Sequence, residues 1–438
     1  MKDSKKLLLN TGIIFAGTII GSFCSYLYNM LMGRMLGPEQ YGQMTALLSM
    51  MLIVTIGGGA IGNVVTRYAS DFYHRACFGA LNKLFGKLTK YMFVLSACLL
   101  FIGIFFISFI GKFFSISNPV PIVIALVSMI FGYTVVVNRG ILQGAQKFRE
   151  VSISNVAEAL LRLVAGYILV RIGFGIDGAL IAIVFSGASI YLLTLYQARR
   201  VLSVSESKDK EDLVFSRKEI FNYSIPSFLN ALFLAVIMNI DIIMINHFFP
   251  GPEAGLYSAV STVGKIILFI TAPISSVLFP MISERKTTGE KHYRLFFMGL
   301  AGTVVIGLLI LGIYVMMPGK ILLILYGRQY SEFFYLLPEV GLAFLFCSLV
   351  NLLANYYLAI KNYVFLWFFG LITLASLLVI YFYHPSILFI VRILITSFGL
   401  LFFLMMVYYL YTKKEQIIFF LKGEYGQDTE TFNNNPGV

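Results

Sequence analysis

The sequence contains few charged residues. Asp, Glu, Lys and Arg make up 12% of its 438 residues, whereas an ordinary soluble domain carries about 25%. This shortage excludes a disordered chain, a protein that coats nucleic acid and an ordinary cytosolic enzyme. Cysteine is scarce as well, and the four cysteines form no C-x-x-C pair. Neither a disulfide framework nor a bound metal is therefore expected.

Hydrophobic residues take up 59% of the chain instead. Apolar runs long enough to cross a bilayer as a helix recur from end to end. We therefore predict an all-α membrane protein with about twelve transmembrane helices of roughly 20 residues or more. The predicted spans are residues 10–33, 41–66, 91–111, 120–138, 151–171, 177–197, 221–248, 256–281, 294–317, 335–360, 363–383 and 386–411.

Lysine and arginine are concentrated in every other connection between these spans. By the positive-inside rule, this places those connections and both termini in the cytoplasm, as in a multi-pass protein of the plasma (inner) membrane. The basic loops are also expected to contact anionic lipids. Nucleic acid is not an expected partner, because the positive charge is spread over many separate loops.

The longest hydrophilic stretch before the tail lies at the midpoint of the chain. It divides the sequence into a six-helix lobe over residues 1–198, a cytoplasmic basic linker over 199–220 and a second six-helix lobe over 221–412. Residues 413–438 form a polar tail, which we place in the cytoplasm.

The two halves contain a repeated motif. Residues 37–49 read GPEQYGQMTALLS and residues 251–262 read GPEAGLYSAVST. With a one-residue gap, Gly42 aligns with Gly255 and Thr45 with Ser258. The same register aligns the pair Ser-Asp at 70–71 with Ser-Glu at 283–284. Both copies enter from the same side, so the lobes should be related by a parallel pseudo-twofold axis along the membrane normal, as in carriers that rock two lobes around a central site.

This register also aligns two segments that weaken a helix at one depth. In the alignment of the two halves, the segment that contains Gly57, Gly58 and Gly59 corresponds to the segment that ends in Pro273. Matching interruptions in two halves indicate a transport site, so we predict a helix break that acts in gating. The alternative is that the glycines let two helices pack closely.

The order of these motifs resembles the oligosaccharide flippases, the polysaccharide biosynthesis proteins of the multidrug/oligosaccharidyl-lipid/polysaccharide (MOP) superfamily. Residues 158–163 (EALLRL) and 239–245 (NIDIIMI) look similar to that family as well. The resemblance covers nearly the whole chain. It implies a transporter, not an enzyme, that moves a polyprenyl-diphosphate-linked glycan from the inner to the outer leaflet. It also implies glycosyltransferases and a polysaccharide polymerase as partners in surface polysaccharide assembly.

Charged residues inside the spans are candidates for function, because each costs about 2.5–3.5 kcal/mol at the bilayer centre even on a lenient scale. Glu158 and Arg162 lie four residues apart, so they share a helix face and can form an ion pair. Arg162 is a candidate ligand for a diphosphate, since a guanidinium binds phosphate oxygens bidentately. A purely structural pair is the equal alternative.

Asp241 lies in the seventh span, where it could bind Na⁺ or H⁺ and couple an ion gradient to transport, a role that Glu158 could share. Alternatively it pairs with Lys265 or Arg392. Lys265 lies about 14 Å into the eighth span, at 1.5 Å per residue, and is a second candidate for the substrate cavity. Apart from a coupling ion, no cofactor is expected.

The remaining candidates are polar residues with a structural alternative. Arg34 and Arg67, at opposite ends of the first two spans, could guide a phosphate or simply anchor their helices at the interface. Asn351 and Asn355 share a face of the tenth span, where they could bind sugar hydroxyls or hydrogen-bond to another helix.

Two other functions stay open at this point. A cation-coupled multidrug exporter of the same superfamily would use Asp241, although Arg162 and Lys265 suit an anionic substrate better. A membrane glycosyltransferase or polymerase is the second alternative. Short outer loops and the lack of a catalytic constellation, such as a paired-carboxylate site, argue against it.

Overall fold

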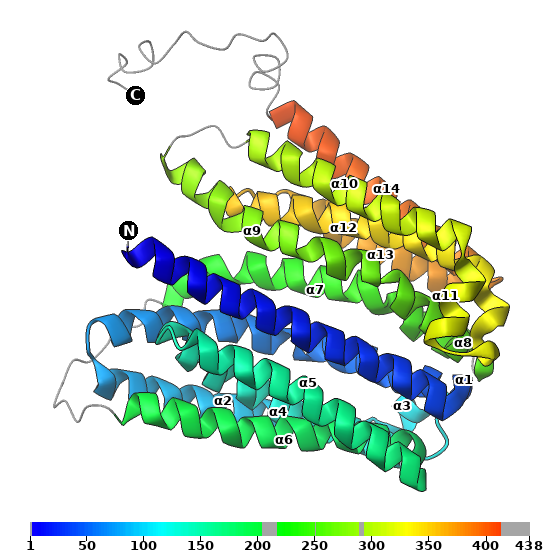
Figure 1. The fold of residues 1–438 in the computed structure, drawn as a ribbon, viewed down its shortest axis with the longest axis horizontal. Helices are drawn as coiled ribbons and strands as arrows, with labels where there is room; N and C mark the ends of the chain where they lie inside the picture. The colour runs from blue at the N-terminus through cyan, green and yellow to red at the C-terminus, as the bar shows by residue number, and fades with distance from the viewer. Residues whose placement is uncertain (1, 204–216, 250, 289–292, 413–438) are drawn as a thin grey trace.

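The computed structural model describes residues 2–203, 217–249, 251–288 and 293–412. Every regular element in these residues is a helix. Figure 1 shows that the helices form two bundles that lie side by side, one built from the first half of the chain and one from the second. The prediction of an all-α membrane protein is confirmed.

The first bundle begins with a helix of 73 residues that contains one sharp kink. Gly37 has φ 76° and ψ 169°, a conformation that glycine adopts far more readily than other residues. Figure 1 shows that α1 folds back within its own length. The elements of this bundle are α1 (Lys2–His74), α2 (Phe78–Phe105), α3 (Ile107–Phe113), α4 (Val120–Gly144), α5 (Phe148–Leu169), the π-helix η1 (Val170–Phe174) and α6 (Gly175–Leu202).

The second bundle has a similar plan, with a short break between its second and third elements. Its elements are α7 (Arg217–Phe248), α8 (Pro252–Gly264), α9 (Ile266–Thr288), α10 (Tyr293–Met316), α11 (Pro318–Leu325), the 3₁₀ helix η2 (Arg328–Leu336), α12 (Leu337–Ala359), α13 (Phe365–Phe382) and α14 (Ile387–Thr412).

The helix lengths agree with the predicted number of spans. In the described residues, ten continuous helical stretches are long and apolar enough to cross a membrane, and two of these are 58 and 55 residues long. At 1.5 Å per residue each of the two is more than about 80 Å long, which is over twice the hydrocarbon thickness of about 30 Å. Each therefore supplies two crossings, and the total is twelve.

Two predicted boundaries are wrong in the same sense. Helix α2 begins at Phe78 and not near residue 91, because Leu81, Leu84 and Phe85 bury an apolar stripe while Lys83, Lys87 and Lys90 on the same helix stay exposed. Helix α4 extends to Gly144, so Arg139 belongs to the helix and not to the loop that follows.

The predicted break at Gly57–Gly58–Gly59 is also wrong. Helix α1 keeps helical dihedral angles through these residues, and Gly37 is its non-helical position. A Cβ on Gly58 would lie 3.1 Å from the ring of Tyr133 on α4, so this glycine allows close helix packing. Pro273 likewise lies inside the continuous helix α9.

Helix α1 packs against both bundles, on α4 and α5 in its own bundle and on α7 and α8 in the other. The predicted lobe limits remain a prediction. Helix α6 extends to Leu202 and α7 begins at Arg217, whereas most of the predicted linker and the predicted tail lie outside the described residues.

The bundles meet where the repeated motifs come together. Gly42 lies against Gly255, and Gly255 lies against the carbonyl group of Pro38. The Thr45 hydroxyl donates a hydrogen bond of 2.9 Å to the Ser258 hydroxyl. Gly42 and Gly255 are equivalent in the repeat, as are Thr45 and Ser258. Residues meet their own equivalents only next to a twofold axis, so the pseudo-twofold axis passes through this contact.

A polar cavity between the two bundles as the candidate functional site

A cavity of about 880 Å³ lies between the bundles, next to the contact between the repeated motifs. Residues of α1, α4, α5 and α6 form one wall, and residues of α7, α8 and α9 form the other. Thr45 and Thr262 line the end of the cavity next to this lobe contact, which we call the closed end. The lining continues along the first segment of α1 to Gly17, and we call that end, on the side of the N-terminus, the open end.

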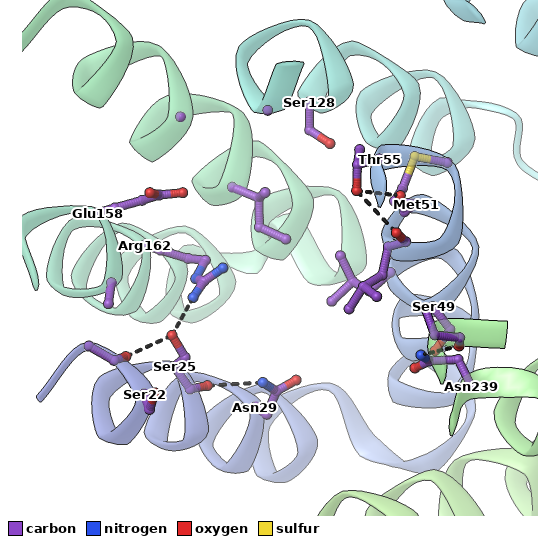
Figure 2. A pocket seen from close by; sticks show the side chains of 18 of the residues that line it. Ser22, Ser25, Asn29, Ser49, Met51, Thr55, Ser128, Glu158, Arg162 and Asn239 are labelled. Atoms are coloured by element: carbon purple, nitrogen blue, oxygen red, sulfur yellow. Dashed lines mark hydrogen bonds between the residues drawn. The ribbon is translucent and has the colours of Figure 1, made fainter. Parts of the chain in front are cut away.

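Arg162 is the central cation of the first wall. Its Nη2 atom donates a hydrogen bond of 2.6 Å to the Ser25 hydroxyl on α1, as Figure 2 shows. The guanidinium also lies 5.4 Å from the ring centroid of Tyr28, and the Tyr28 hydroxyl is fixed by a 2.8 Å bond to the carbonyl oxygen of Ala179. Arg162 therefore lines the cavity without a carboxylate partner in the described residues.

Glu158 pairs with Arg139 and not with Arg162. The Arg139 Nη2 atom lies 2.6 Å from the Glu158 carboxylate, and its Nε atom lies 3.3 Å from the Ser154 hydroxyl. The predicted pair within α5 is therefore wrong. Spacing along one helix allowed that pair, but an arginine from the neighbouring helix α4 reaches the carboxylate instead. All three charged residues line the cavity.

Arg139 is a cavity residue that the sequence reasoning missed, because the predicted fourth span ends at residue 138 whereas α4 continues to Gly144. The signal was present, since Gly140, Ile141, Leu142 and Gly144 continue the apolar character of the helix. These small and apolar residues pack α4 against α1, which holds the Arg139 side chain toward Glu158.

The second wall buries its charged residues more deeply. Asp241 is completely buried and accepts hydrogen bonds from the hydroxyls of Tyr257, at 2.9 Å, and Ser261, at 2.6 Å. Both bonds go to Oδ2, and Oδ1 has no hydrogen-bond partner among the residues that the structure describes. Lys265 is 8% exposed and lines the cavity, with its Nζ atom 3.4 Å from Asn239 Oδ1. Asp241 itself is not among the lining residues.

Neither predicted ion pair of Asp241 is formed. Across the described chain, no ion pair within 4 Å joins Asp241 to Lys265 or Arg392. Arg392 instead lies 3.6 Å from the carboxylate of Glu339. Hydroxyl donors from α8 contact the carboxylate instead, so in the described residues it is buried without an ion-pair partner within 4 Å. Lys265 interacts with it electrostatically over a longer distance.

The other predicted site residues lie away from the cavity. Arg34 donates to the carbonyl oxygens of Leu325 and Ile324 at the end of α11, the first at 2.8 Å. Arg67 is exposed on α1. Asn351 and Asn355 hydrogen-bond to each other along α12. The structure therefore brings Arg162, Lys265 and Glu158 together and leaves these four outside.

The cavity is positively charged overall. Arg139, Arg162 and Lys265 line it against the single carboxylate of Glu158, and serine, threonine and asparagine side chains supply most of its other polar groups. Such a lining suits a ligand with negative charge and many hydroxyl groups, because cations pair with its charge and neutral polar groups hydrogen-bond to the rest.

The fold is shared with solved transporters of the MOP superfamily. An inward-facing multidrug resistance MATE transporter superposes with a TM-score of 0.71 at 15% identity, over 91% of this chain and 96% of the other. The lipid II flippase MurJ, in an inward closed conformation, superposes with a TM-score of 0.67 at 13% identity, over 95% of this chain and 93% of MurJ. A MOP transporter from Pyrococcus furiosus superposes with a TM-score of 0.63 at 16% identity, over 91% of this chain and 95% of the other.

The fold is therefore that of the solved MOP-superfamily transporters, with a central cavity between the two bundles. Residues 7–286 match the family model of the polysaccharide biosynthesis proteins, and the chain belongs to that family. It is also 24% identical over 274 residues to an uncharacterized membrane protein of Methanocaldococcus jannaschii. That match covers 60% of this chain and 64% of the relative, which is less than two thirds of its length.

Proposed function

We propose that the protein is a flippase that moves a polyprenyl-diphosphate-linked oligosaccharide from the inner to the outer leaflet for surface polysaccharide assembly. The observation that carries this proposal is the charge of the cavity, where Arg139, Arg162 and Lys265 outnumber Glu158. A diphosphate is the negatively charged part of such a substrate, and family membership supports the glycan as its other part.

Arg162 is the residue best placed to hold the diphosphate. Its contacts with Ser25 and Tyr28 fix the guanidinium in the wall, so little conformational entropy is lost on binding. A guanidinium also stays charged and presents several donors at once. Arg139 is shared with Glu158 and becomes available to phosphate to the extent that this pair opens. Lys265 provides a positive charge from the opposite wall.

Alternating access would move the substrate across the membrane. The closed end of the cavity is the contact between the repeated motifs, and the open end is on the side of the N-terminus. By the positive-inside rule, the basic loops support a cytoplasmic location for that side and for both termini of a protein in the plasma membrane. The structure superposes better on the inward-facing MATE transporter than on an outward-facing one, with TM-scores of 0.71 and 0.62. These observations support a substrate that enters from the cytoplasmic side.

Asp241 is the proposed site of ion coupling, by Na⁺ or H⁺. It is completely buried, its Oδ1 atom has no hydrogen-bond partner in the described residues, and the groups bonded to Oδ2 are neutral. A buried carboxylate without an ion-pair partner in direct contact is stabilised by a bound proton or metal ion. Glu158 is a weaker candidate because Arg139 already neutralises it.

The cavity argues against the two alternative functions. A cationic drug would meet three positive side chains and one carboxylate, which disfavours a multidrug exporter. A glycosyltransferase or polymerase is not supported by the family or by the fold. Glycosyltransferases and a polymerase are instead proposed as partners, and anionic lipids as contacts of the basic loops.

The test uses cells that lack the gene. Polyprenyl-diphosphate glycans would be extracted and quantified by mass spectrometry, and we expect a complete repeat unit to accumulate. The wild-type gene should reverse the accumulation, and Arg162→Ala should not. Arg171→Ala is the matched control, since Arg171 is exposed and does not line the cavity. Unchanged lipid-linked glycans together with greater sensitivity to cationic dyes would contradict the proposal and favour the drug exporter.

A further inference from the structure

The contact between the lobes at the closed end of the cavity depends on two glycines. A Cβ built on Gly255 would overlap the carbonyl oxygen of Pro38, and one built on Gly42 would come within 2.8 Å of the Gly255 nitrogen. Both obstacles are backbone atoms, which cannot turn aside as the end of a side chain can. Helices that approach so closely need residues without a side chain at the contact.

These two glycines differ from those that pack helices within one lobe. Gly140 and Gly144 lie against Val65 and Ala69, but all four residues belong to the first bundle. Such contacts move with their bundle as a rigid body when the lobes rock. The contact between Gly42 and Gly255 joins the two bundles, so it must separate before this end of the cavity can open.

Several hydrogen bonds between the lobes surround the glycine contact. The hydroxyl of Thr45 bonds to that of Ser258 at 2.9 Å, and the hydroxyl of Tyr41 lies 3.1 Å from that of Tyr326. The Tyr330 hydroxyl donates to the carbonyl oxygen of Gly33 at 2.7 Å. These donors and acceptors are within hydrogen-bond distance only while the helix backbones are this close. The whole set of contacts between the lobes at the closed end therefore requires the two glycines.

We propose that Gly42 and Gly255 select the conformation of the transporter. Because these positions carry no side chains, the lobes can close at this end. A single methyl group there would block the closed state and leave the open state unaffected. Once the lobes have parted, the same methyl group no longer meets Pro38 or the opposite helix. Gly255→Ala therefore shifts the equilibrium toward the state that is open at this end. The inference rests on the lobe contact and does not depend on which substrate is carried.

The experiment measures two distances between spin labels by double electron–electron resonance, on the full chain in lipid nanodiscs without substrate. Cys24, Cys77, Cys98 and Cys347 are first replaced by alanine. One label pair, Glu39→Cys with Glu253→Cys, spans the closed end. The other, Asn63→Cys with Ser276→Cys, joins repeat-equivalent positions of α1 and α9 toward the open end. All four labelled positions are exposed.

Adding Gly255→Ala should lengthen the distance of the first pair and shorten that of the second. The ratio of closed to open populations should fall by about tenfold or more, because the state that is closed at this end becomes the minor one. Gly42→Ala should give a smaller shift in the same directions. Gly59→Ala is the matched control, since a Cβ on this helical glycine meets nothing within 4 Å, and it should leave both distances unchanged.

Unchanged distances in Gly255→Ala would overturn the proposal, and so would an equal shift in Gly59→Ala. Thermal unfolding and size-exclusion profiles show whether Gly255→Ala is folded. If it is not, Gly42→Ala decides, and unaltered distances in that variant overturn the proposal as well. A failure of the flippase hypothesis would appear in the glycan measurement and would leave these distances as they are.

Discussion

The two walls of the cavity come from the two halves of the chain and differ in chemistry. On the first wall, Arg139, Glu158 and Arg162 all line the cavity and are only partly buried. On the second wall, Asp241 is fully buried behind the lining and Lys265 is 8% exposed. In the described chain, these two are the ionisable acidic and basic side chains with the lowest exposure. The repeat has therefore preserved the helix arrangement while the charges have diverged.

This difference suggests a division of labour between the lobes. Accessible cations can exchange water for a ligand at low cost, whereas a buried carboxylate is costly to leave charged and so responds strongly to a bound cation. We expect substitutions in the first lobe to change substrate affinity and substitutions in the second to change ion dependence. The following predictions test that division, from the largest expected effect to the smallest.

Arg162→Ala should cause the largest loss. Truncation of a charged group that is held in place and contacts an opposite charge costs about 2–5 kcal/mol, which corresponds to at least about a 30-fold weaker Kd. Binding of a short-chain polyprenyl diphosphate to purified protein, measured by isothermal titration calorimetry, provides the test. Arg162→Lys should recover part of the affinity, since it keeps the charge but not the bidentate geometry. Equal affinity in Arg162→Ala and wild type would remove this residue from the site.

Asp241→Asn should abolish ion dependence and leave substrate affinity within about threefold, a change of less than 1 kcal/mol. The amide keeps the size of the side chain and removes the charge that a cation would neutralise. Flipping in proteoliposomes with imposed Na⁺ or pH gradients measures the effect. If Asp241→Asn transports at the wild-type rate and responds to both gradients as the wild type does, coupling at this residue is excluded. Asn239→Ala is the control for a change near Lys265 that leaves the carboxylate intact.

Glu158→Gln should strengthen anion binding. Arg139 would lose its carboxylate partner at 2.6 Å and could contribute its full charge to the cavity. We expect a Kd that is lower by about three- to tenfold, since one partly exposed charge near a ligand contributes roughly 1 kcal/mol. The same calorimetric titration measures it. Weaker binding would show that the carboxylate contacts the substrate directly, for example through a sugar hydroxyl.

Asn351→Ala should have the smallest effect. Its side chain bonds to Asn355 within α12 and does not line the cavity, so we expect unchanged transport and a loss of stability of about 1 kcal/mol or less. Complementation of the deletion strain and thermal unfolding provide the two measurements. A transport defect with normal stability would mean that this face of α12 joins the cavity in another conformation.

The sequence predicted the fold well because the fold is encoded in long apolar runs. In the described residues ten long apolar helices are present, two of them long enough for two crossings each, and the aligned glycines Gly42 and Gly255 meet at the contact between the bundles. The two errors at helix ends have different causes. At the start of α2, basic residues on the exposed face hide the buried stripe of Leu81 and Leu84. At the end of α4, Arg139 interrupts an apolar run that continues beyond it.

The site was harder to predict, because partners come from different helices. Arg162 and Lys265 were found from their charge in an apolar span, but the partner of Glu158 is Arg139 on another helix. Spacing within one helix could not reveal it. The prediction of a helix break at Gly58 was wrong for a related reason. A glycine in a helix can weaken the helix or allow another helix to pack closely, and only the position of Tyr133 on the facing helix shows that Gly58 does the second.

The meeting of Gly42 with Gly255 also bears on how such a chain could arise. A half-length gene encoding six helices would give a product that pairs with a second copy of itself through an isologous interface, and residues on the axis of that homodimer would touch themselves. One glycine codon would then have provided both halves of the contact. After duplication and fusion the two codons could mutate separately, yet the geometry of the closed contact still admits a side chain at neither position.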